Sequence, residues 1–162
     1  MELEINKIIV HKDHGLCKIV GKEYMSFVSK NYYIMNPLST PNMKVMVPED
    51  KTNDFCRDVL TREQCLHIVD SIKNLSDDYI VDNKKRKEEY TKLLHSENLL
   101  DIAQLLKYLW TMFENKRAKN KAIGSIDTSI YNEAKTKLYS EIQYVMEIKD
   151  EDGVVEFIKS RL

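Results

Sequence analysis

A short basic stretch stands out within "DDYIVDNKKRKEEYTKLL" (77–94), where the positive charge of the chain is densest. Lysine and arginine side chains bind phosphate oxygens, so this stretch could grip a nucleic-acid backbone. One tyrosine, Tyr79, lies just upstream and could stack against a base. The cluster itself consists of Lys84, Lys85, Arg86 and Lys87.

A solvated helix face explains the same stretch equally well. In a helix Lys84 would face Glu88 and Lys85 would face Glu89, and each such pair adds only about 0.2–0.5 kcal/mol. A second basic cluster could partly complement a helix C-terminal dipole. Two clusters in one small bundle favour a phosphate-facing surface, but both interpretations stay open. The second cluster consists of Lys116, Arg117, Lys119 and Lys121.

The usual signatures of catalysis and metal binding are missing. The sequence has no phosphate-binding GxxxxGK[ST] loop, no GxGxxG and no GxSxG, and its paired carboxylates lie in charged runs typical of surfaces. His11 and His14 form an HxxH pair that could meet a metal with Cys17, but further ligands are not evident. We therefore expect no metal, no cofactor and no enzymatic activity; a deep polar pocket with convergent titratable groups would reopen the question.

The composition is that of a globular protein without a membrane segment. The chain has 162 residues, 43% of them apolar, and no run of 18 or more apolar residues. Three cysteines without a CxxC spacing predict reduced thiols and a cytoplasmic location. The net charge of -1 argues against a protein that coats DNA by itself. Any DNA contact must be local, or a larger partner must supply the DNA.

The first part of the chain is predicted to form a β structure. Short β-branched and aromatic runs alternate with turn residues, and Gly15 suits a tight turn. Five short strands in under fifty residues imply a small, strongly bent antiparallel sheet or barrel. The expected strands are 4–10, 16–21, 23–28, 32–36 and 43–47.

From about residue 61 the apolar period becomes helical. "TREQ" (61–64) has the form of a capping box, and Trp110 lies on an apolar stripe that predicts a core position. The whole is therefore α+β, with domains 1–58 and 59–162 and a boundary within 49–60. The expected helices are 61–74, from about Ser76 or Asp77 to 95, from Ser96 to a break at 121–125, 126–146 and 151–161.

The order of several segments resembles CarD-family bacterial transcription regulators. Each segment is weak alone, but together they follow the family's order over about residues 5–147. The transcription–repair coupling factor shares the N-terminal part but also has helicase motifs, which are absent here. The matching segments are "VHKDHGLCKIVG" (10–21), "NMKVMVP" (42–48), "CRDVLTREQ" (56–64), "DNKKRKEEYTKLL" (82–94), "LLKYLW" (105–110) and "AKTKLYSEI" (134–142).

This resemblance implies a Tudor-like (SH3-like) β barrel that docks on the RNA polymerase β-subunit lobe, followed by an all-α helical bundle. In the family the bundle contacts promoter DNA at the upstream edge of the transcription bubble. There an aromatic wedge, usually tryptophan, and basic residues hold the opened minor groove. Polymerase would then supply both the affinity and the DNA, which explains the low net charge. The expected partners are the β subunit and promoter DNA, with no membrane, and the chain is expected to be a monomer.

Several residues inherit expected roles from the resemblance. Tyr79 replaces the wedge tryptophan in one alignment, whereas a shorter spacing places Asp82 there. The two basic clusters would contact DNA. Met25, Lys44 and Met46 fall at polymerase-contacting positions, although a core position for either methionine is an open alternative. A protein–protein adaptor without a DNA role is the competing hypothesis, since the tryptophan is missing and the net charge is near zero.

Overall fold

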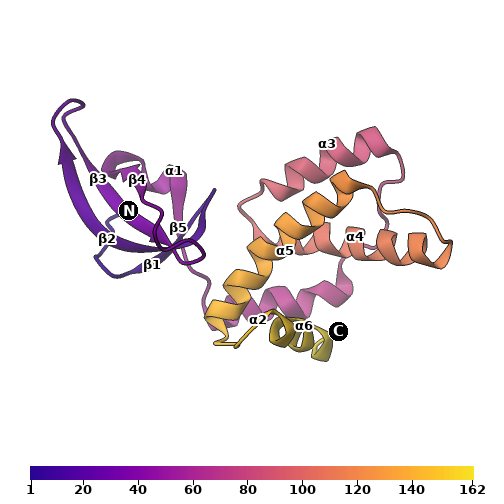
Figure 1. Ribbon diagram of the computed structural model, residues 1–162. Helices are drawn as coiled ribbons and strands as arrows, with labels where there is room; N and C mark the ends of the chain where they lie inside the picture. Colours follow the sequence, from indigo (N-terminus) through magenta and orange to yellow (C-terminus); the bar gives the residue numbers. More distant parts are fainter. The chain divides into compact units, whose positions relative to one another are not determined.

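The computed structural model describes all 162 residues and divides into two compact units, residues 1–59 and 60–162 (Figure 1). The first unit contains all five strands, and the second unit contains helices and no strand. The fold is therefore α+β, as predicted. None of the helices is both long and apolar enough to cross a membrane.

The first unit is built on one antiparallel sheet with the strand order β4-β3-β2-β1-β5. β4 and β5 are its two edges, so no pairing between strands closes it into a barrel. A short 3-10 turn, Glu49–Lys51, and helix α1, Thr52–Phe55, lead from β4 to β5. The strands are β1 Ile8–His11, β2 Gly15–Met25, β3 Lys30–Pro37, β4 Val45–Pro48 and β5 Cys56–Asp58.

Three of the strand predictions were wrong in their limits. The expected strands 16–21 and 23–28 are one strand, β2, which continues through a bulge between Ile19 and Gly21. A bulge bends a strand without ending it. β1 begins only at Ile8, because Asn6 has a left-handed backbone with φ of 73°. β5 was not predicted, and it pairs with β1 at residues 9–11. Gly15, with φ of 68°, makes the expected turn.

One face of the sheet holds the core of the first unit. Alternate side chains of the strands point to this face, as the pleat requires. The buried backbone N–H of Leu3 donates to the Tyr33 hydroxyl at 3.2 Å, which ties the N-terminal residues to the same core. The buried members are Leu3, Ile9, Cys17, Ile19, Tyr33, Met35, Val45, Val47 and Cys56.

The second unit is a helical bundle with a single apolar core. The predicted capping box at the start of α2 is confirmed: Gln64 N–H donates to the Thr61 hydroxyl at 3.1 Å, and Thr61 N–H donates to Gln64 Oε1 at 2.9 Å. The elements are α2 Arg62–Ser71, a 3-10 turn η2 Ile72–Asn74, α3 Asn83–Leu94, α4 Leu99–Ala118, α5 Ser125–Val145 and α6 Glu151–Ser160.

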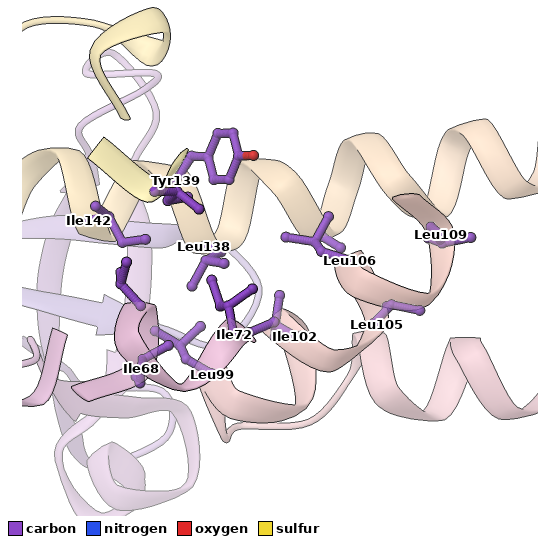
Figure 2. Close-up of a cluster of buried hydrophobic side chains, with 14 of the residues drawn as sticks. Ile68, Ile72, Leu99, Ile102, Leu105, Leu106, Leu109, Leu138, Tyr139 and Ile142 are labelled. Carbon is purple, nitrogen blue, oxygen red and sulfur yellow. The ribbon is translucent and has the colours of Figure 1, made fainter. Parts of the chain in front are cut away.

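Helix α4 runs through the middle of this core, with leucine and isoleucine side chains that meet those of α2 and α5 (Figure 2). Trp110 packs against the cluster from a half-buried position, and its indole N–H donates to the Tyr131 hydroxyl at 3.0 Å. Trp110 therefore packs against the core as expected, but it lies at the edge of the cluster and is not one of its buried residues. Residues labelled in the figure include Ile68, Ile72, Leu99, Ile102, Leu106, Leu138 and Ile142.

Helix α3 begins later than predicted. Asp82 is its N-cap and accepts the Lys85 N–H at 2.8 Å, so residues 76–82 lie outside the helix. The Ser76 hydroxyl accepts the Asp78 N–H at 3.1 Å instead of starting a helix there. Tyr79 therefore lies on a segment without regular secondary structure that leads into α3.

Candidate functional surfaces

Three helix ends meet at one end of the helical unit. Short connections, residues 95–98 and 119–124, make α3, α4 and α5 successively antiparallel. The start of α3, the end of α4 and the start of α5 consequently lie together, beside the segment before α3 (Figure 1). We call this region, residues 76–87 and 116–127, the basic end.

Both predicted basic clusters lie at the basic end. Neither of the ion pairs expected within α3 is formed, since Glu89 pairs with Lys92 at 3.3 Å. None of the cations below has a carboxylate oxygen within 4.0 Å, so their charge is directed to solvent. The exposed cations are Lys84, Lys85, Lys87, Arg117, Lys119 and Lys121, with Lys116 half-buried.

Arg86 does not belong to this exposed set. It is 5% exposed and forms a two-bond pair with the Asp127 carboxylate, with Nε to Oδ1 and Nη2 to Oδ2 both at 2.9 Å. Its remaining N–H groups donate to the backbone oxygens of Ile80 and Val81 and to Asn83 Oδ1 at 2.8 Å. A guanidinium has five N–H donors, and all five are used within the chain. Arg86 therefore holds the basic end together and has no donor left for a phosphate.

Electrostatics keep Arg86 charged in this pair. The hydrogen-bonded Asp127 carboxylate raises the pKa of Arg86 above its already high ordinary value. Burial raises the pKa of Tyr90, so its phenol stays neutral and its oxygen accepts the Ile80 N–H at 3.1 Å. The backbone of Ile80 is thus held at both its N–H and its carbonyl by side chains of α3.

Tyr79 and Val81 have opposite surroundings on this segment. Tyr79 is half-buried against the helical core, and its hydroxyl accepts a hydrogen bond from Asn115 Nδ2 at 3.2 Å. Val81 is 77% exposed. The apolar side chain that the segment presents to solvent is therefore Val81, which no pattern in the sequence singles out. Asp127 and Tyr90 were missed as well, because no local pattern links Arg86 to a residue 41 positions later.

The three residues expected to contact polymerase lie on one face of the sheet or at its rim. Met46 is opposite Ile34 in β3, on the face that does not carry the core residues Val45 and Val47. Met25 is opposite Lys30 and reaches this same outer face, about 13 Å along β3 from Met46. Lys44 Nζ lies 3.7 Å from Glu23 Oε2 at its rim. Both methionines are half-buried, and neither belongs to the core cluster.

Cys17, Cys56 and His11 of the first unit contribute to its packing. Cys17 and Cys56 are buried in its core, and burial raises the pKa of each thiol to about 11, which keeps them protonated at neutral pH. The His11 ring stacks on Phe55 at 5.8 Å between centroids, and its Nδ1 accepts the Asp13 N–H at 3.1 Å. No group of three or more histidine, cysteine, aspartate or glutamate side chains is placed to hold a metal ion.

Comparison with protein-family models assigns both units. Residues 3–60 match the CarD-like/TRCF RID domain, and residues 67–159 match the CarD C-terminal domain. The chain belongs to the CarD family. Its domains are those of RNA polymerase-interacting transcription factors, and CarD-family proteins are regulatory binding proteins without catalytic activity. No curated protein matches the chain.

Proposed function

We propose that this CarD-family chain binds the RNA polymerase β-subunit lobe through the outer face of its sheet and contacts promoter DNA through the basic end. By binding upstream-fork DNA it stabilises the open promoter complex. Stabilisation by about 1.4 kcal/mol shifts the equilibrium towards the open complex tenfold. The observation that carries the DNA part is the gathering of unpaired cations from α3 and from the end of α4 at one end of the bundle.

The sheet supports the polymerase part. Its outer face offers Met25, Tyr32 and Met46 around the buried Ile34, with Lys44 and Glu23 neutralising each other at the rim. Lys30, opposite Met25 on this face, is paired with Asp50 at 2.9 Å. The apolar patch around Ile34 fits an apolar partner surface, and methionine adapts its shape easily. Lys44 contributes its aliphatic stem and a charge already satisfied within the chain.

The low net charge fits this division of labour. A chain with net charge -1 gains little from long-range attraction to DNA. Anchoring on polymerase raises the local concentration of the basic end near the promoter, so a few phosphate contacts suffice.

The test is the salt dependence of promoter-complex stabilisation. In Lys84→Ala/Lys87→Ala the decay of open complexes should quicken. The magnitude of the slope of log affinity against log salt should fall by about 1–2, because fewer phosphate contacts form and fewer counterions are released on binding. The matched control is Lys149→Ala/Lys159→Ala, which removes two exposed lysines outside the basic end.

Binding to the isolated β lobe is measured alongside. Lobe binding that is unchanged in both double variants, with a lower slope in the first alone, supports the proposal. Lobe binding without any effect of the wild-type chain on complex decay would favour an adaptor that has no DNA role. Absence of lobe binding would refute the polymerase part.

A further inference from the structure

Val81 is the most exposed large apolar side chain within the helical unit, at 77%. A second one, Ile126, is 50% exposed and directly precedes Asp127 in the first turn of α5. The same guanidinium, that of Arg86, holds the carbonyl of Val81 at 2.9 Å and the carboxylate of Asp127. Two exposed apolar residues are thus attached to one buried ion pair.

The backbone that carries Val81 is fixed although its side chain is free. Arg86 donates to the carbonyls of Ile80 and Val81, and the Tyr90 hydroxyl oxygen accepts the Ile80 N–H. Tyr79 anchors the segment to Asn115 on α4. An exposed loop residue normally loses backbone freedom when it binds. Here that loss has already occurred on folding, so the side chain is preorganised for contact.

The surroundings of Val81 indicate the chemistry of its partner. Lys84, Lys85 and Lys87 follow it on α3, and none of them has an acidic partner in the chain. A small apolar tip among unpaired cations complements a polyanion with an accessible apolar surface. Duplex DNA at a partly unstacked base step has both properties, whereas a protein surface would need to supply a matching acidic ring.

We propose that Val81 is the side chain that the basic end packs against an opened base step of promoter DNA, and that the Arg86–Asp127 pair is its positioning element. Tyr79 then anchors the segment instead of entering the DNA. This rests on the proposed function, which it deepens by assigning the contact to Val81. Aliphatic side chains serve this purpose in minor-groove binders, where unstacking is offset by apolar contact and by a wider protein surface.

The direct test is Val81→Ala in open complexes assembled with polymerase. The lifetime of the complex should fall about five- to tenfold, as expected for the loss of a small apolar contact. Because Val81 is exposed, the stability of the chain should not change. Leu162→Ala truncates another exposed apolar residue, outside the basic end, and should leave the lifetime at the wild-type value.

The positioning role is tested by a matched pair of variants. Asp127→Asn breaks the pair with Arg86, and Asp70→Asn breaks the two-bond pair of Asp70 with Arg161, at 2.6 and 2.9 Å, which links α2 to the end of α6. Asp127→Asn should shorten the lifetime about as much as Val81→Ala, with no further loss when the two are combined. Asp70→Asn should leave the lifetime at the wild-type value when the two variants are compared at a temperature at which both are equally folded.

The results separate this inference from the proposed function. A wild-type lifetime for Val81→Ala, together with an effect of Lys84→Ala/Lys87→Ala, would overturn the assignment to Val81 and keep the DNA contact. Absence of an effect in both variants would overturn the DNA contact itself. Equal losses for Asp127→Asn and Asp70→Asn would reduce Arg86 to a general stabiliser.

Discussion

At the scale of residues, the four consecutive cations 84–87 have two different roles. Arg86 is buried with five hydrogen bonds, whereas Lys84, Lys85 and Lys87 are exposed. The chemistry explains which residue is inside: a planar guanidinium can satisfy all its donors in a fixed geometry, while a lysine ammonium keeps strong hydration. Without the position of Asp127, the sequence alone could not tell which member of the run is structural.

Replacement of Arg86 by methionine should destabilise the helical unit by about 3–5 kcal/mol, because it leaves the Asp127 carboxylate buried without its partner. Urea unfolding followed by the fluorescence of Trp110 measures this, since the only tryptophan lies in the helical unit. Arg117→Met is the control, as Arg117 is exposed. A loss below about 1 kcal/mol for Arg86→Met would contradict the role given to the pair.

At the scale of elements, the bulge in β2 decides which residues can meet a partner. Cys17 and Ile19 point to the core, and strict alternation would carry Gly21 and Met25 there as well. The extra residue at the bulge reverses the alternation, so that Gly21 pairs with the outward-facing Ile34. Met25 consequently shares the outer face with Met46.

Two neighbouring substitutions in β4 should therefore have opposite effects. Met46→Glu should weaken binding to the β lobe at least tenfold while the chain stays folded, because it brings an unpaired charge to an apolar contact. Val47→Glu should unfold the first unit, because Val47 is 1% exposed in its core. Lobe titration and circular dichroism of both variants measure the two effects. A Met46→Glu variant that binds like wild type would remove this face from the contact.

The sequence predicted elements better than their limits. The helices with long apolar stripes, such as α4, and the capping box of α2 were predictable, because periodicity and caps are local signals. The bulge in β2 and the late start of α3 were not. At residues 76–82 the cap signals of Ser76 and Asp82 compete. Side-chain hydrogen bonds of Arg86 and Tyr90 to the backbone of Ile80 and Val81 hold this segment outside the helix. The surface positions of the lysines could be expected from their charge alone. The exposure of Val81 could be recognised only in the tertiary structure.

At the scale of the whole molecule, two separate surfaces belong to one chain with net charge -1. An exposed cluster of a few lysines binds DNA weakly at physiological salt. Attachment of the first unit to polymerase would place the second at an effective concentration of about 1 mM, typical of short linkers. The DNA contact would then depend on the polymerase contact, although the two surfaces share no residue.

This dependence gives a prediction about rescue. Met46→Glu should lose the stabilisation of open complexes although its basic end is intact, and raising its concentration should restore the effect, since mass action replaces the lost anchor. Lys84→Ala/Lys87→Ala should not be restored in the same way, because its lobe site is already saturated. Titration of each variant against the lifetime of open complexes distinguishes them. If excess Met46→Glu never restores the lifetime, the sheet does more than anchor the chain, and the two units act on polymerase as a single geometric unit.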